Sequence, residues 1–192
     1  HQGDAGWTGN GAEQLPPIVA RGVMIDGAAY KGVDVLPESY RIMPADLQGA
    51  LARQGLALRE GDAVFIRTGR MRLIADRDAY MHNPPGIGLD AAKWLVERNG
   101  AMLVGSDNLS LETFPVETPH NWVPVHTYLE AEQGVAIMEV VDLEALSRDK
   151  VYEFAFIGAS LKLRGASGAP MRPIAIPVRS ESRHGSRHGS RG

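Results

Sequence analysis

Two polar residues of this 192-residue chain, His126 and Glu139, lie in a segment that is otherwise rich in apolar residues. Residues 124–143 predict a helix, a turn at Gly134 and a buried strand over 135–141, in which Glu139 is the one charged residue. A continuous apolar run is typical of a strand that is covered on both faces. A bare carboxylate there costs several kcal/mol unless a cation, a metal ion or a proton neutralises it.

Elementary geometry brings these two side chains together. From residue 126 to 133 a helix advances about 10 Å, and from 135 to 139 a strand returns about 13 Å, so the two side chains come level after the turn. An imidazole nitrogen and a carboxylate oxygen in one site suit zinc or manganese. A His–Glu hydrogen bond, or an Arg–Glu pair that holds the core, explains the same spacing, and the residues alone leave these alternatives open.

The composition is that of an ordinary globular chain, with 44% hydrophobic and 22% charged residues. We expect one domain over residues 1–178. The absence of cysteine excludes disulfides and thiolate ligands, and no apolar run approaches the roughly 18–20 residues of a membrane span. No signal peptide is apparent, so we expect a cytoplasmic protein that does not bind membranes.

The charge is divided unevenly along the chain. Residues 179–192 hold four arginines and one glutamate, which leaves −6 on the first 178 residues of a chain whose net charge is −3. An acidic body argues against nucleic acid as a partner, because phosphate binding needs a concentrated basic face. The repeat RHGSRHGSRG has nothing to bury, so we expect a disordered polar tail over 179–192.

Predicted strands and helices interleave along the chain, which indicates the α/β class. The strands are expected at 18–26, 63–68, 102–105, 135–141, 152–157, 161–163 and 174–176, and the helices at 44–54, 89–99, 126–133 and 143–146. The helix at 44–54 has a proline at its first position and a glycine after its last, but Met43 offers no capping oxygen. The segment GASGAP predicts a tight turn around Gly165 and Gly168.

Further polar residues come after the predicted strands. Asp107 and Glu112 lie in a loop after a strand, the usual place for functional groups in α/β folds. For Asp107 we favour a turn-former that bonds its own backbone, and Glu112 is either a ligand or a solvated charge. For Arg67 and Arg70 we favour a structural role, in a pair with Glu139 or Asp107, over binding of a substrate carboxylate.

The loop TPHNWVP precedes the predicted helix of His126. His120 and Trp122 in this loop are candidates to line a pocket for a planar substrate. For Trp122 we favour a hydrophobic staple that packs against the helix. His82 is expected on a surface loop.

Six segments together resemble the cyclase-like metal-dependent hydrolases, the family that includes kynurenine formamidase and isatin hydrolase. They are PPIVARGVMID, PADLQGALARQG, EGDAVFIRTGR, VGSDNLSLE, PVHTYLEAEQGVAIMEVVDLEAL and GASGAPMRPIAIP. The resemblance implies a swivelling β/β/α domain, a mixed sheet with flanking helices, and a homo-oligomer. It also implies that His126 and Glu139 are metal ligands, with zinc or manganese as the cofactor.

The family motif HxGTHxDxxxH, which supplies further ligands and an acid/base histidine, is absent from this sequence. The opening residues resemble the family's segment directly after that motif, so we assign the acid/base role to His1 and expect an N-terminally truncated representative. The implied activity is hydrolysis of an amide, lactam or ester bond in a small aromatic substrate, of the arylformamidase or cyclic amidase type. The alternative is a non-catalytic binding or oligomerisation module of the same fold.

Overall fold

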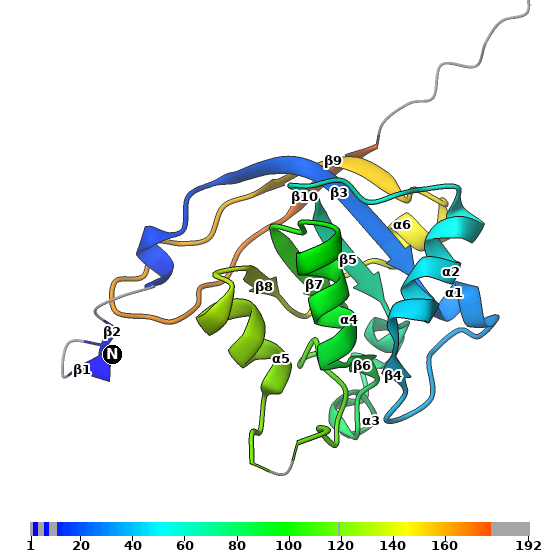
Figure 1. Ribbon diagram of the computed structural model, residues 1–192, viewed down its shortest axis with the longest axis horizontal. Coiled ribbons are helices and arrows are strands. Elements are labelled where there is room, and N and C mark those ends of the chain that lie inside the picture. The colour runs from blue at the N-terminus through cyan, green and yellow to red at the C-terminus, as the bar shows by residue number, and fades with distance from the viewer. Residues whose placement is uncertain (1, 4–5, 8–10, 119, 178–192) are drawn as a thin grey trace, which may run out of the picture.

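A six-stranded mixed sheet forms the centre of the computed structural model, which describes residues 2–3, 6–7, 11–118 and 120–177 (Figure 1). The strand order is β10-β9-β3-β5-β7-β8. The strands are β3 (Ile18–Asp26), β5 (Ala63–Arg67), β7 (Leu103–Ser106), β8 (Ala136–Met138), β9 (Glu153–Gly158) and β10 (Ile174–Pro177). The α/β class and the mixed sheet with flanking helices are confirmed.

Four of these strands run parallel, and their register places their carboxyl ends together. Met24 of β3 is opposite Phe65 of β5, which is opposite Gly105 of β7, and Gly105 is opposite Met138 of β8. β9 pairs antiparallel with β3, and β10 pairs antiparallel with β9. The loops that leave the parallel strands therefore meet at one edge of the sheet, which is where α/β folds usually place their sites.

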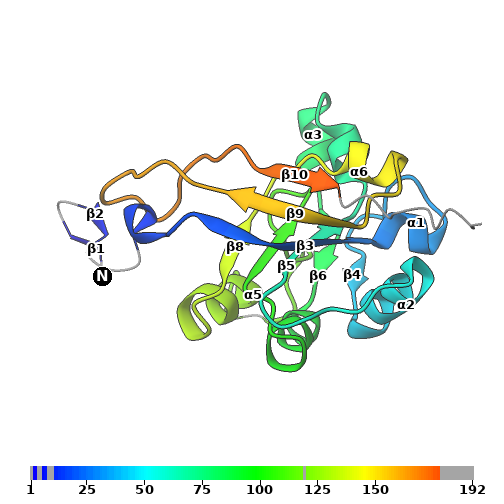
Figure 2. The same ribbon diagram turned by 90° about the horizontal axis from the view of Figure 1, so that it is seen from above.

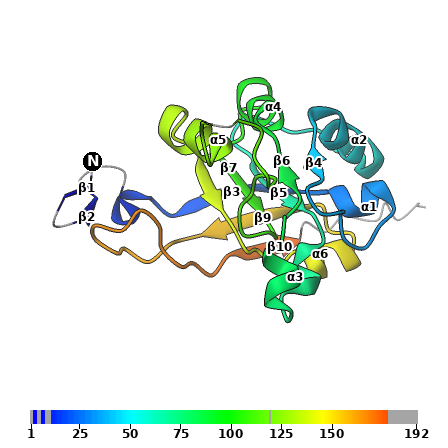
Figure 3. The same cartoon turned by 90° about the horizontal axis from the view of Figure 1, so that it is seen from below.

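Helices cover both faces of the sheet. One face carries α2 (Pro44–Gln54), α4 (Leu89–Lys93) and α5 (Pro124–His126), and the other carries α6 (Glu144–Arg148), as Figures 2 and 3 show. α4 continues as the π-helical η3 (Trp94–Arg98), and α5 continues as the π-helical η4 (Thr127–Glu132). The remaining short elements are β1 (Gln2–Gly3), β2 (Gly6–Trp7), η1 (Ala12–Gln14), α1 (Gly27–Lys31), β4 (Arg41–Ile42), η2 (Arg70–Leu73), α3 (Arg77–Met81) and β6 (Gly86–Ile87).

Alternation along the strands divides the core into two clusters. Val23 and Ile25 of β3 face the helices α2, α4 and α5, whereas Met24 between them faces the opposite cluster. In that second cluster Phe65 contacts Phe154 and Phe156 of β9, with ring centroids 5.8 and 5.0 Å apart. Packing on both faces holds the sheet in place, and the carboxyl edge of this sheet carries the polar residues.

Two predicted strands differ from the structure. The strand expected at 135–141 is only β8 (Ala136–Met138), and it lies at the edge of the sheet, although it packs on both faces: Ile137 against one core cluster, and Ala136 and Met138 against the other. It ends early because Val140 adopts a left-handed backbone (φ 56°) and the amides of Val140 and Val141 donate to the carbonyls of Asn108 and Ser106. The strand expected at 161–163 is a loop with exposed leucines, closed by the turn in which Gly165 has φ 78°.

Candidate functional site

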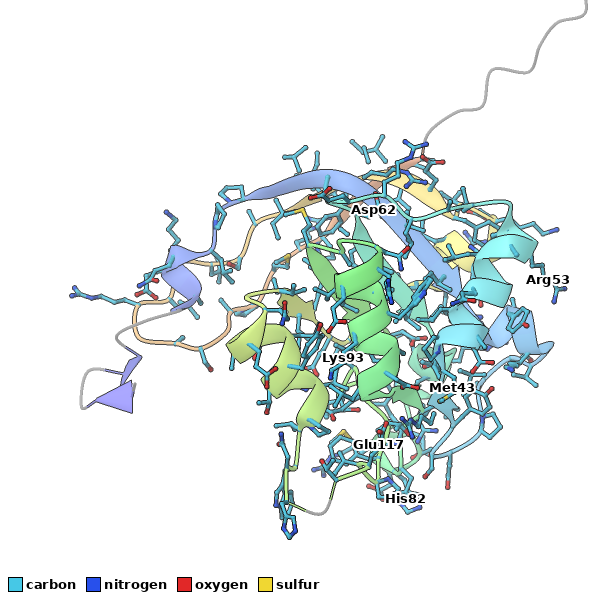
Figure 4. The ribbon with its side chains drawn as sticks, in the orientation of Figure 1. Met43, Arg53, Asp62, His82, Lys93 and Glu117 are labelled. Atoms are coloured by element: carbon cyan, nitrogen blue, oxygen red, sulfur yellow. The ribbon has the colours of Figure 1, made fainter. Side chains whose placement is uncertain are left out.

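The candidate site lies at the carboxyl edge of the parallel strands. Figure 4 places Asp62, which immediately precedes β5, and His82 at opposite ends of the molecule. His82 lines a pocket of about 570 Å³ together with His126 and Glu139. β5 begins directly after Asp62 and runs toward the side of the molecule where His82 lies (Figure 4). The pocket is therefore at the end where the parallel strands finish.

The structure brings His126 and Glu139 together, as the spacing predicted. His126 lies at the end of α5, Glu139 comes directly after β8, and the imidazole Nε2 is 3.2 Å from the carboxylate Oε1. Both side chains are partly exposed, at 23% and 30%, and both line the pocket. A direct His–Glu contact, one of the alternatives that the sequence left open, is therefore present.

A second carboxylate, that of Glu112, binds the opposite edge of the imidazole ring, at Nδ1. Glu112 Oε1 is 2.7 Å from Nδ1 of His126, and its side chain is only 2% exposed. The same carboxylate accepts the backbone N–H groups of Val125 and His126, each at 3.3 Å, at the first turn of α5. These N–H groups have no acceptor within the helix, so Glu112 caps the helix and binds the imidazole at once.

The two carboxylates govern the charge of the imidazole. Burial lowers the pKa of His126, but the hydrogen bonds to Glu112 and Glu139 outweigh it and raise this pKa to about 9. An ionised carboxylate only accepts hydrogen bonds, so each ring nitrogen donates a proton to its partner. At neutral pH the histidine is therefore an imidazolium held between two carboxylates.

The arrangement fits two positions in the coordination shell of a divalent metal. Two donor atoms at about 2.1 Å from one ion are about 3.0–3.4 Å apart in octahedral or tetrahedral geometry, which includes the 3.2 Å between Nε2 and Oε1. A partly exposed imidazole and carboxylate on one pocket are also suitable ligand types. Within the ranges that the structure describes, however, no group of three or more such side chains is arranged to hold a metal ion.

The pocket walls beside this pair are largely apolar. Its lining comprises Met81, His82, Asn83, Pro84, Leu109, Ser110, Phe114, Val123, His126 and Glu139. A separate hollow of about 400 Å³ includes Lys93 and Tyr128 but neither member of the His–Glu pair. We therefore regard the larger pocket as the candidate site.

The remaining charged candidates are structural. Asp107 is fully buried and accepts from the amides of Thr68 and Gly69 and from the Thr68 hydroxyl, so it ties the end of β5 to the end of β7. Arg67 bonds to Asp26 and Glu144, and Arg70 donates to the carbonyls of Tyr80 and His82. Both arginines are structural, as favoured, but the expected pairs with Glu139 and Asp107 are wrong: Arg67 pairs with other carboxylates, and Arg70 bonds backbone carbonyls.

The loop before α5 departs from expectation. Trp122 is 83% exposed, so the prediction of a staple packed against the helix is wrong. His120 lines the smaller hollow, and His82, although exposed as predicted, also lines the candidate site. His1 and the tail at 179–192 lie outside the described residues, so the acid/base role of His1 stays a prediction.

Glu112 is the site residue that the sequence did not resolve. Its position in a polar loop was visible, but its contact with His126 depends on how that loop crosses the start of α5. A parallel bridge between Ile87 and Glu112 fixes this crossing. No pattern in the residues around Glu112 indicates this pairing.

Comparison with known proteins places the chain in a family. Residues 2–113 match the sequence family described as "Putative cyclase". The chain belongs to this family. Glu112 falls within the matched residues, whereas His126 and Glu139 lie beyond them.

Solved structures share the fold of this cyclase-family chain. The crystal structure of a novel cyclase is 36% identical, with a TM-score of 0.76 over 86% of this chain and 56% of its own. Isatin hydrolase A from Ralstonia solanacearum is 22% identical, with a TM-score of 0.72 over 88% of this chain and 65% of its own. The predicted resemblance to cyclase-like hydrolases is thereby confirmed at the level of family and fold.

A curated relative matches a shorter stretch of this cyclase-family chain. Cyclase-like protein 3 of Oryza sativa subsp. japonica is 33% identical over 87 residues, which are 45% of this chain and 29% of the rice protein. This chain thus spans less than two thirds of the length of each of these three relatives. None of the helices within the described ranges is long and apolar enough to cross a membrane.

Proposed function

We propose that this chain carries part of the active site of a metal-dependent hydrolase, which cleaves an amide, lactam or ester bond in a small aromatic substrate. The observation that carries the proposal is the pair formed by His126 Nε2 and Glu139 Oε1, 3.2 Å apart on a pocket of about 570 Å³. Membership of the cyclase family and the shared fold of the isatin hydrolases support it.

His126 and Glu139 are the residues that would hold zinc or manganese. When bound, such an ion polarises a carbonyl group and lowers the pKa of a water molecule toward 7. Glu112 keeps the proton on Nδ1 of His126, so Nε2 is the nitrogen that exchanges its proton for the cation. His1 is proposed as the acid/base group that delivers a proton to the leaving nitrogen.

The apolar lining of the pocket supports a small aromatic substrate. Met81, Leu109, Phe114 and Val123 contribute apolar surface on the same pocket as the His–Glu pair. An aromatic ring has little polar surface to desolvate when it packs against these side chains. In that position the scissile bond attached to the ring lies next to His126. We therefore propose cleavage of a C–N bond in a formyl amide or a cyclic amide of an aromatic compound.

Metal content and turnover together test this function. We expect the purified full chain to bind zinc or manganese, and His126→Ala to lose at least about ten-fold in affinity, as measured by elemental analysis after dialysis against each metal. His82→Ala is the matched control, because His82 lines the same pocket but its imidazole lies 3.7 Å from the carboxylate of Glu38 rather than against Glu139. Formylkynurenine and isatin are the substrates to assay.

Equal metal content in the parent protein and His126→Ala would contradict the metal role.

A second candidate is a non-catalytic module of the same fold, and it is favoured by one observation. The described residues contribute only two neighbouring metal donors, whereas catalytic zinc usually has three protein ligands. This candidate predicts no stoichiometric metal and no turnover, with small aromatic compounds still binding in the pocket.

A further inference from the structure

Glu112 is bound more completely than a carboxylate that only caps a helix. Its Oε1 atom contacts both Nδ1 and the backbone nitrogen of His126, at 2.7 and 3.3 Å, and its Oε2 atom contacts the backbone nitrogen of Val125 at 3.3 Å. The residue as a whole is 1% exposed. One buried carboxylate therefore fixes both the backbone and the ring of His126.

The chemistry of the carboxylate determines which ring nitrogen faces the pocket. Because an ionised carboxylate accepts but does not donate, Nδ1 must carry a proton to meet Glu112. A half turn of the ring would replace Nδ1 with a carbon atom and leave the buried carboxylate without this partner, which is costly. Nε2 is consequently directed toward Glu139 and the pocket.

The loop that carries Glu112 is itself rigidly held. The Asn108 side chain accepts the amide of Leu111 at 2.8 Å, and the Ser110 hydroxyl donates to the Glu112 carbonyl at 2.8 Å. Gly86 of β6 runs against the backbone of Glu112 so closely that an added Cβ atom would collide with it. Glu112 is therefore in place before any ligand enters the pocket.

We propose that Glu112 is the positioning residue of the site: it sets the tautomer and the ring orientation of His126, and thereby the affinity of the His126–Glu139 pair for a divalent metal. The part of this proposal that concerns metal affinity rests on the proposed function. The part that concerns ring orientation is independent of it. Partners that orient a ligating histidine commonly account for a 10–100-fold change in metal affinity.

Two variants separate the orienting role from helix capping. Glu112→Ala removes every acceptor, whereas Glu112→Gln retains an oxygen for Nδ1 and turns an amide donor toward the backbone N–H of Val125. Glu97→Gln is the control, because Glu97 bonds the Tyr128 hydroxyl of η4 at 3.0 Å without contacting His126. Thermal unfolding reports the loss of the cap, which both Glu112 variants share.

The orientation of the His126 ring is read from crystal structures of the metal-free variants and from the ¹⁵N signals of the imidazole. We expect the ring to leave its contact with Glu139 in Glu112→Ala and to keep it in Glu112→Gln and Glu97→Gln. Zinc affinity, measured by competition with a chelating dye, should fall 10–100-fold in Glu112→Ala, less in Glu112→Gln and not at all in Glu97→Gln.

A ring that keeps its position in Glu112→Ala would overturn the proposal and leave Glu112 as a helix cap. If Glu112→Ala does not fold, a zinc affinity of Glu112→Gln equal to that of the parent, despite its lower thermal stability, would overturn it as well. A parent protein that binds no zinc would contradict the proposed function, and the ring orientation alone would then decide the role of Glu112.

Discussion

At the scale of single residues, the buried charges of this protein fall into two groups. Asp107 and Arg67 satisfy their hydrogen bonds within the fold, and neither lines the candidate pocket. His126 and Glu139 instead keep part of their surface exposed to the pocket. Partial exposure at the pocket therefore separates His126 and Glu139 from these two structural charges, whereas the buried Glu112 belongs to the site through its contact with His126.

Arg67 gives the first prediction at this scale. Its side chain is 5% exposed and joins Asp26 of β3 to Glu144 of α6, with Nη1–Oδ1 at 3.0 Å and Nε–Oε1 at 2.7 Å. Arg67→Met leaves the buried carboxylate of Asp26 without its cation, so we expect the free energy of unfolding to fall by about 3–5 kcal/mol. Urea denaturation measures this loss.

The control for Arg67 is Arg148→Met, since Arg148 pairs with Asp149 while remaining 72% exposed. This exposed pair should contribute little to stability, because water screens its attraction. Replacing Arg67 and Asp26 together, by Met and Asn, should restore part of the stability, because the unpaired buried charge is then removed. Equal losses for Arg67→Met and Arg148→Met would contradict the structural role.

At the scale of elements, the start of α2 illustrates how a helix without a capping residue is stabilised. Met43 has no capping oxygen, as the sequence indicated, but Asp46 in the first turn accepts the Met43 amide at 3.0 Å. The same carboxylate lies 2.5 Å from Nζ of Lys31 and 3.2 Å from the Tyr40 hydroxyl. Asp46 thus joins the start of α2 to the end of α1.

These contacts predict a pH dependence of stability. Burial raises the pKa of Asp46, but the bonds from Lys31 and the Met43 amide outweigh it and leave this pKa below its ordinary value of 3.8. A depressed pKa means that the ionised carboxylate stabilises the folded state above about pH 4, and that this contribution is lost as the pH falls through the folded pKa.

Asp46→Asn keeps an oxygen for the Met43 amide but removes the charge that pairs with Lys31, so we expect the free energy of unfolding to fall by up to about 1 kcal/mol at pH 7. As the pH falls below 3.8 and through the lowered pKa of folded Asp46, the difference between parent and variant should shrink toward zero. Denaturation curves at neutral pH and in acid provide the measurement. A difference that stays constant or grows on acidification would contradict the assigned role of Asp46.

Elements whose form depends on local pattern were predictable from the sequence. The helix α2 has the predicted bounds, with Pro44 at its start and Gly55 in the left-handed conformation (φ 70°) after its end. The approach of His126 to Glu139 was also predictable, because only the rise per residue of one helix and one strand determines it. The carboxyl-edge site follows from the parallel order of the strands.

Features that depend on contacts distant in sequence were not predictable. β8 ends at Met138 because the chain bends to bond the end of β7, and the apolar run continues past that bend. The pairing of Glu112 with His126 arises from the crossing of two loops, which leaves no periodic signal. The short helix α1, capped by Asp26 after β3, was not predicted either, because its five residues are too few to show a helical pattern.

At the scale of the whole molecule, the outer face of β3, β9 and β10 is exposed and apolar. These strands lie side by side in Figure 2, and their register places Val19 opposite Ile157 and Ile157 opposite Ile174. Val19 is 75% exposed, Ile174 48% and Ile176 51%. The alternate residues Phe154 and Phe156 point into the core, so Val19, Ile157 and Ile174 form one apolar row across the three strands, bordered by the ion pair of Arg21 and Glu153.

This surface supports the expectation of a homo-oligomer. A contiguous apolar face on a soluble domain usually marks an interaction site, and a chain can cover it by pairing with a second copy of itself. We predict that Val19→Lys combined with Ile174→Lys shifts the chain toward a monomer of 20.7 kDa, as measured by sedimentation velocity over a range of concentrations.

Val33→Lys is the control for this prediction, because Val33 is 40% exposed and lies in the loop after α1. Like charges introduced on a shared face repel and lose solvation on association, whereas a charge at Val33 remains in water. A parent protein that sediments as a monomer at every concentration would show that this face is not used for self-association.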